Sequence, residues 1–278
     1  SCGPRYSSAW VPDYKKLGWG EEQDKVWNIE AVDNVTNYDF LKDQVQHVQK
    51  IYFAGGEPLM SPNFWKFLDM IEGFKGTLII NSNLICHKDE IERLLEKTKD
   101  IKLRIHTSIE SNFKQAEYVR DGFEEKTWLQ NVAKILDTKR IPLHLSTAIN
   151  NMSVWSFDDY LKTAIGLKGM FGRDLVEISC NFVHYPKFMS IDLIPHFYQK
   201  SIAEKIANVY KMFGAMFNET EQDHIVRLMS LLETATIEDK DKDLLSDLKT
   251  FIAEFDQRRG KNYKEFLDEN FIDWYGKL

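Results

Sequence analysis

The stretch Ile51-Tyr52-Phe53-Ala54-Gly55-Gly56-Glu57-Pro58 decides the fold, because a mainly apolar run ends abruptly in a double glycine, a glutamate and a proline. This order predicts a buried strand that ends in a tight turn. The glycines lack a Cβ, so they adopt positive φ and let a ligand approach the backbone closely. Backbone carbonyls and the Glu57 carboxylate are acceptors that suit an ammonium group. A plain turn between a strand and a helix is the alternative that this stretch leaves open.

Strand-like and helix-like patterns alternate after this turn. Further strands are expected at 77–80, 101–109, 143–149 and 175–183, and helices at 37–50, 62–73, 88–97, 124–137 and 157–167. Alternation with short connections favours a parallel sheet with right-handed crossovers. The chain is therefore expected to be an α/β protein with an open or closed barrel, and periodicity alone does not choose between these two.

The pattern changes from Ile194 onward, where only helices are expected, at 201–213, 219–234 and 243–255. The mixed charge run at 238–243 is typical of a solvated linker or a helix start, so it does not predict a metal site. We expect two parts, a barrel at 1–195 and a helical C-terminal extension at 196–278.

Composition and charge narrow the class of protein. With 278 residues, 43% of them hydrophobic, the chain can bury a large core. The net charge of −7 disfavours a nucleic-acid partner. The sequence contains no apolar stretch long enough for a membrane span and no pattern of a secretion signal. Three scattered cysteines are no disulfide framework, so a cytoplasmic location is expected.

The start of the chain, Ser1-Cys2-Gly3-Pro4, together with Gly55-Gly56-Glu57-Pro58, resembles the radical S-adenosylmethionine (radical SAM) enzymes. In that family a CxxxCxxC loop holds a 4Fe-4S cluster, and Cys2 matches the last of its cysteines. Cys86 and Cys180 do not restore the spacing. The resemblance implies that the natural gene continues upstream with CxxxCxx, and that the fold is a partial TIM-type (β/α)6 barrel without its first strand. It also implies S-adenosylmethionine as cofactor and an external electron donor.

The resemblance extends to candidate cofactor-binding residues. The segment Gly55, Gly56, Glu57, Pro58 is expected to hold the methionyl amine. Ser108 and Arg120 are expected to contact the methionyl carboxylate, and Glu110 completes the matching His106-Thr107-Ser108-Ile109-Glu110 segment. A guanidinium suits a carboxylate because it binds through paired hydrogen bonds. A surface ion pair of Arg120 with Glu117 or Glu124 stays open as the structural alternative.

Two further segments belong to the same resemblance. Asn150, in Ser146-Thr147-Ala148-Ile149-Asn150-Asn151, is expected to meet the ribose hydroxyls, or else to be a loop residue that tolerates left-handed φ. The tail at 255–260 and 263–267 is similar to the ending of twitch-domain radical SAM enzymes. No cysteine follows Cys180, so we expect one cluster and no auxiliary one.

The implied function is reductive cleavage of S-adenosylmethionine and hydrogen abstraction from an unidentified substrate, with a peptide or a small metabolite favoured. The competing hypothesis is a non-catalytic barrel that binds an adenosyl ligand or a protein partner and has lost the cluster. A third is a barrel hydrolase in which Glu57 and Glu110 act as acid and base.

Overall fold

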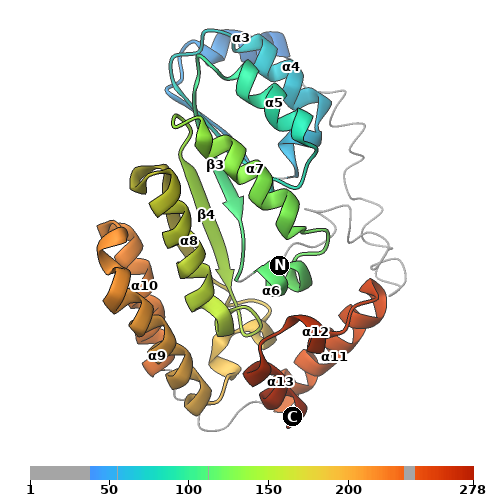
Figure 1. Ribbon diagram of the computed structural model, residues 1–278. Coiled ribbons are helices and arrows are strands. Elements are labelled where there is room, and N and C mark those ends of the chain that lie inside the picture. Colours follow the sequence, from blue (N-terminus) through green and yellow to red (C-terminus); the bar gives the residue numbers. More distant parts are fainter. Residues whose placement is uncertain (1–37, 55, 112, 235–241) are drawn as a thin grey trace. The chain divides into compact units, whose positions relative to one another are not determined.

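The computed structural model describes residues 38–54, 56–111, 113–234 and 242–278. Its five strands form one parallel sheet in the order β1-β2-β3-β4-β5 (Figure 1). They are β1 (Lys50–Phe53), β2 (Thr77–Asn81), β3 (Lys102–Ser108), β4 (Leu143–Ile149) and β5 (Val176–Phe182). These bounds confirm the five predicted strands to within a residue or two. The sixth strand of a (β/α)6 barrel stays a prediction.

Most of the predicted helices are present. The helices are α3 (Tyr38–Val45), α4 (Pro62–Met70), α5 (Lys88–Lys97), α6 (Phe113–Val119), α7 (Glu125–Asp137), α8 (Phe157–Phe171), α9 (His196–Phe213), α10 (Glu219–Thr234), α11 (Lys242–Arg259), α12 (Tyr263–Phe266) and α13 (Glu269–Gly276). Helices α6, α12 and α13 were not predicted, because so few turns give little periodicity. No helix in the described ranges is long and apolar enough to cross a membrane.

The described residues form two compact units. The first contains the residues up to 82 together with 86–105, and the second contains 83–85 together with 106–278. In the first unit, Phe53 of β1 packs edge-on against Phe64 and Phe67 of α4, with ring centroids 5.2 and 4.9 Å apart. Trp65 joins α4 to α5, because the Arg93 guanidinium lies 4.3 Å from its ring centroid. These contacts anchor the helices on the strand that carries the GGEP turn.

Gly76 fixes the start of the β1–β2 pairing. The amide of Thr77 donates to the carbonyl of Gln49 at 2.9 Å, and the register then runs from Lys50 opposite Thr77 to Phe53 opposite Ile80. A Cβ on Gly76 would lie 2.4 Å from the Gln49 oxygen. Only glycine therefore allows this close approach of the two backbones.

In the second unit, one face of β4 and β5 is apolar and buried, and helices cover it. Trp128 of α7 donates its indole N–H to Thr107 Oγ1 at 3.1 Å. Tyr160 of α8 donates its hydroxyl to the Leu145 carbonyl at 3.1 Å. Both acceptors belong to buried residues of the sheet. Helices α7 and α8 therefore lie on this face of the sheet. Figure 1 shows both helices beside β3 and β4.

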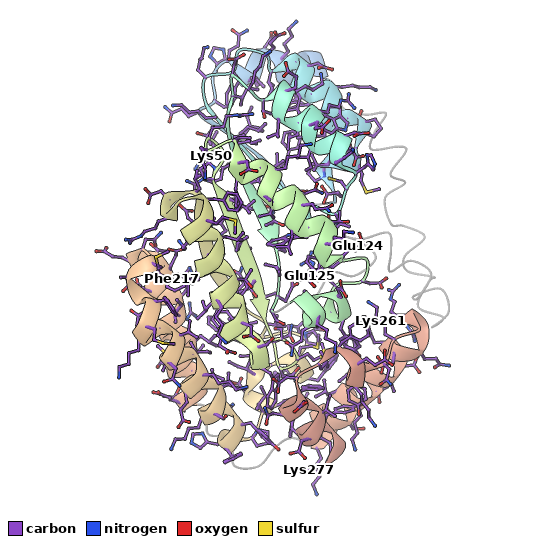
Figure 2. All side chains as sticks on the ribbon, in the orientation of Figure 1. Lys50, Glu124, Glu125, Phe217, Lys261 and Lys277 are labelled. Carbon is purple, nitrogen blue, oxygen red and sulfur yellow. The ribbon has the colours of Figure 1, made fainter. Side chains whose placement is uncertain are left out.

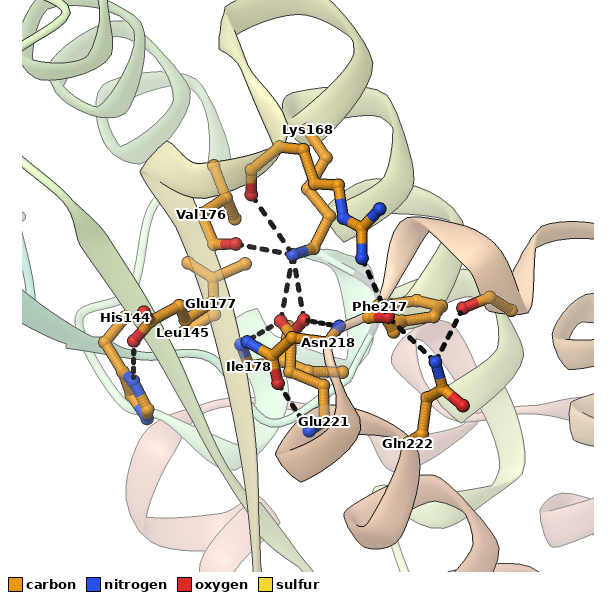
Figure 3. A network of polar contacts seen from close by, with 12 residues as sticks. His144, Leu145, Lys168, Val176, Glu177, Ile178, Phe217, Asn218, Glu221 and Gln222 are labelled. Atoms are coloured by element: carbon orange, nitrogen blue, oxygen red, sulfur yellow. Dashed lines mark hydrogen bonds and ion pairs between the residues drawn. The ribbon is translucent and has the colours of Figure 1, made fainter.

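A buried ion pair joins α8, β5 and α10 (Figure 3). Lys168 Nζ lies 2.9 Å from Glu221 Oε1, and the two side chains are 1% and 2% exposed. Lys168 also donates to the Val176 carbonyl at 2.6 Å. The Glu221 carboxylate accepts from the amides of Ile178 at 2.8 Å and Asn218 at 2.7 Å. Both charges are therefore compensated by hydrogen bonds as well as by each other.

The C-terminal helices are tied to the segment that carries Arg120. Tyr118 donates its hydroxyl to Asp256 at 2.8 Å, and the Lys261 ammonium donates to the Glu117 carbonyl at 2.6 Å where α11 approaches α6 (Figure 2). Arg259 lies 3.2 Å from the Asp121 carboxylate. We call Asp256, Arg259 and Lys261 the tail clamp.

An aromatic cluster closes the same end of the second unit. The Trp155 ring lies 5.4 Å from Tyr198 of α9 and 6.0 and 5.9 Å from Phe271 and Trp274 of α13. Its indole N–H donates to the Asn151 carbonyl at 2.7 Å, so the polar edge of the ring is satisfied. The cluster thus joins α13 to the segment between β4 and α8.

The first prediction concerns the buried ion pair. We expect Lys168→Met to lower the free energy of unfolding by about 3–5 kcal/mol, because it leaves the Glu221 carboxylate buried without its cation. Lys162→Met on the same helix is the matched control, since Lys162 is half exposed and pairs with Asp158 and Asp159. Exposed pairs contribute about 0–1 kcal/mol. Urea denaturation of both variants checks this, and equal losses would contradict the assignment.

The second prediction concerns the tail clamp. Asp256→Ala removes the acceptor of both the Tyr118 hydroxyl and the Tyr263 amide. We expect faster amide hydrogen exchange in 116–123, with α8 and α10 unchanged, because opening is local when one anchor is lost. Glu254→Ala on α11 is the control, since Glu254 pairs with Arg258 along its own helix. Exchange measured by mass spectrometry decides the point; unchanged protection at 116–123 would show that the clamp does not hold this segment.

Candidate functional site

The chain bends at Gly56, shortly after β1, and Glu57 and Pro58 follow. Gly56 has φ +60°, a left-handed conformation that favours glycine. Glu57 Oε1 accepts from the Leu59 amide at 3.3 Å and from Ser82 Oγ at 2.7 Å. Pro58 is buried and opens a short 3-10 helix, Pro58–Met60. Gly55 lies outside the described residues. The turn therefore fixes the Glu57 carboxylate from two sides, at the ends of β1 and β2.

The polar residues after β2 stabilise the local backbone. Asn81 Oδ1 accepts from the Tyr52 hydroxyl at 3.0 Å, and Asn83 Oδ1 accepts from the Ile85 amide at 2.8 Å. His87, and not one of these asparagines, caps the N-terminus of α5.

An ion pair between Glu110 and Arg120 follows β3. Arg120 Nη1 lies 2.6 Å from Glu110 Oε1, and the Arg120 side chain is 31% exposed. Ser108, half-buried, is the last residue of β3. The spacing suggested Glu117 or Glu124 as the ion-pair partner of Arg120, and the structure gives Glu110 in their place. A guanidinium has five N–H donors, so Arg120 can bind a further carboxylate while it holds Glu110.

Glu110 is a buried carboxyl group with one unsatisfied oxygen. The residue is 7% exposed, and among the described residues Oε2 has no hydrogen-bond partner. Burial raises the pKa of Glu110 above its usual value, and the Arg120 guanidinium offsets part of this increase. A buried acceptor without a partner is costly. A ligand that donates to Oε2 would therefore bind favourably beside Arg120.

A buried polar network holds the Glu110 segment in place. Ser111 Oγ and Ser156 Oγ both donate to Gln115 Oε1 at 2.6 Å. Thr147 Oγ1 donates to the Glu110 carbonyl at 2.9 Å. Sequence reasoning missed Ser111, Gln115 and Ser156, because their contacts join positions far apart in the chain. The only signal in the sequence is that such residues follow strand ends.

Asn150 shapes the loop after β4. Its Oδ1 accepts from the amides of Met152 at 2.8 Å and Ser153 at 3.1 Å, which makes an Asx turn. In the described part of the chain, the non-glycine residues with positive φ are Leu84 and Lys139. The left-handed interpretation of Asn150 is therefore wrong, and its side-chain oxygen serves the turn.

The two described cysteines, Cys86 and Cys180, lie in environments that favour the protonated thiol. Burial, followed by the nearby Glu90 and Glu57 carboxylates, raises the pKa of the Cys86 thiol to about 12. Burial raises the pKa of the Cys180 thiol to about 12. Metal ligation requires the thiolate, which these environments disfavour. The described residues also contain no group of three or more His, Cys, Asp or Glu side chains that could hold a metal ion. Cys2 lies outside the described residues.

Two sets of residues therefore suit parts of an amino-acid ligand, and each is described within its own unit. In the first unit, the turn at Gly56 and Glu57 offers a glycine without a Cβ and a fixed carboxylate. In the second unit, Arg120 offers a partly exposed guanidinium for a carboxylate. The first set suits an ammonium group, and the second suits a carboxylate.

No family model matches the sequence, and no curated protein matches it. The structure is similar to crystal structures of Streptococcus suis SuiB. The TM-score is 0.46 for SuiB, 0.45 for SuiB bound to S-adenosylmethionine and 0.46 for SuiB bound to the precursor peptide SuiA. Sequence identity is 13%, 12% and 13%, over 63%, 63% and 64% of this chain. The chain spans 40%, 38% and 39% of those chains, respectively.

Proposed function

We propose that this chain belongs to a radical SAM enzyme that binds S-adenosylmethionine, cleaves it reductively and abstracts hydrogen from a peptide or a small metabolite. The observation that carries the proposal is the Glu110–Arg120 pair after β3. The resemblance predicted Arg120 as the ligand of a carboxylate. A buried partner holds the guanidinium, and its other donors meet no acceptor within the described residues. An ordinary surface ion pair would not explain a nearly buried Glu110.

We assign roles to the chain's own residues as follows. Arg120 binds the methionyl carboxylate together with Ser108, and Glu110 orients the guanidinium. The Gly55–Pro58 turn binds the methionyl amine through backbone carbonyls and Glu57. Asn150 shapes the loop expected near the ribose, because its amide oxygen is engaged in the turn.

S-adenosylmethionine and a 4Fe-4S cluster, when bound, supply the reductive cleavage that starts hydrogen abstraction, with an electron from an external donor. The resemblance assigns Cys2 to that cluster. The described residues contribute binding and orientation of the ligand.

The third prediction tests the carboxylate site. In the cluster-reconstituted, full-length protein, Arg120→Ala should weaken S-adenosylmethionine binding by about 1.5–3 kcal/mol, the range for hydrogen bonds to charged groups, or roughly 10- to 150-fold. Lys114→Ala is the matched control, because Lys114 is an exposed cation on α6. Isothermal titration calorimetry measures both. Equal affinity of Arg120→Ala and the wild type would remove Arg120 from the site.

The fourth prediction tests the cluster. Cys86→Ser and Cys180→Ser should leave the iron content of the full-length protein unchanged at about four irons per chain, because burial favours the protonated thiol at both positions. Cys2→Ser should lower it. Iron and sulfide analysis after anaerobic reconstitution decides the point. A loss of iron in Cys86→Ser, or a count near eight, would show a second centre; tight S-adenosylmethionine binding without iron would favour the non-catalytic alternative.

A further inference from the structure

The face of β4 and β5 opposite to the buried one is polar. Figure 3 shows His144 and Glu177 on one side of β5 and the Lys168–Glu221 pair on the other. This polar face carries His144, Ser146 and Ala148 of β4, in register with Glu177, Ser179 and Asn181 of β5. These residues are half-buried or exposed. Nothing in the roles proposed for the cofactor site uses them.

His144 is held on this face by contacts on every side. Its Nε2 lies 2.7 Å from Ser179 Oγ, and its Nδ1 lies 3.4 Å from Glu177 Oε2. The ring stacks on His106 of β3, with centroids 4.6 Å apart and an angle of 26° between planes. The side chain is only 21% exposed. The imidazole therefore has one fixed orientation, in which both nitrogens are engaged.

These contacts set the direction of the hydrogen bond to Ser179. An ionised carboxylate only accepts, so the tautomer of His144 that satisfies Glu177 carries its proton on Nδ1. In this tautomer Nε2 is an acceptor, because the two nitrogens have opposite roles. Ser179 then donates its hydroxyl proton to Nε2. The lone pairs of the Ser179 oxygen are left to accept a hydrogen bond on the half-buried polar face.

Asn181 provides a second acceptor along the same strand. Its Nδ2 donates to Ser146 Oγ at 3.1 Å, which directs the amide and leaves Oδ1 to accept from a ligand. Ser179 and Asn181 are separated by one residue, so their side chains repeat at about 6.6 Å along β5. Alternate N–H groups of an extended peptide point to one edge with the same repeat. The two acceptors thus match the period of an extended backbone.

We propose that the polar face of β5 binds the backbone of an extended peptide, with alternate amide N–H groups donating to Ser179 Oγ and Asn181 Oδ1. His144 is a positioning residue that keeps Ser179 an acceptor. The inference rests on the proposed function, because it selects the peptide from the substrate classes considered there. An extended peptide, whose N–H donors repeat at about 6.6 Å, fits Ser179 and Asn181 better than a compact metabolite does.

The experiment uses two capped peptides that differ in N-methylation of the backbone, which removes the N–H donors. The probe is acetyl-hexaglycine-amide, and its control is acetyl-hexasarcosine-amide, in which N-methyl groups replace the backbone N–H groups. Each is titrated into the full-length, isotope-labelled protein, and NMR follows the Ser179 and Asn181 signals. The same sample gives the His144 tautomer from its ring nitrogen shifts. We expect a protonated Nδ1, and shifts with hexaglycine but not with hexasarcosine.

Variants separate recognition from folding. Ser179→Ala and His144→Phe should each weaken hexaglycine binding roughly two- to tenfold, the effect of one hydrogen bond. Ser246→Ala, at an exposed serine of α11, should change nothing. Equal binding of both peptides, no binding of either, or a protonated Nε2 would overturn the inference. S-adenosylhomocysteine, titrated in parallel, tests the proposed function separately from the peptide site. If S-adenosylhomocysteine does not bind the wild type, the proposed function is contradicted, and the result with the peptides can still be interpreted.

Discussion

The second unit depends on the buried pair of Lys168 and Glu221. Their side chains are almost inaccessible, and removing two charges from water costs more than their mutual attraction returns unless further hydrogen bonds compensate. Here the compensation comes from the backbone, since Glu221 accepts from Ile178 and Asn218 while Lys168 donates to Val176. The pair therefore fixes β5 against α8 and α10 at once. The strand that carries Ser179 and Asn181 is held from the side opposite to its polar face.

The strands were predictable because β1 and β2 are mainly apolar runs bounded by turn residues, as at Ile51 to Gly56, and because β3, β4 and β5 alternate buried and less buried residues. The long helices were predictable for the same reason, with amphipathic spacing over several turns. Helix α6 was not, since it has only seven residues and its contacts with the tail clamp join positions far apart in the chain. A contact between Tyr118 and Asp256 leaves no local trace in the sequence.

The residues of the candidate site were predictable from the sequence, but the contacts between them were not. The resemblance singled out Glu110 and Arg120 separately, and only the structure shows that they bind each other. Their proximity depends on how α6 turns back after β3, which local patterns do not report. The His144–Ser179 contact was missed for a related reason. Alternation along β4 and β5 predicts which residues share a face, whereas the pairing of one strand with the next decides which of them touch.

The contact between Tyr118 and Asp256 joins positions 138 residues apart in the sequence. During synthesis, α6 leaves the ribosome long before the residues of the tail clamp. Trp155 likewise leaves it long before α13, against which its ring packs. Contacts of such long range are slow to form, because the chain between them must first be ordered. The tail clamp therefore cannot secure the Arg120 segment until α11 has been translated. Partly made chains would expose these aromatic side chains, which makes nascent copies of this protein candidates for chaperone binding.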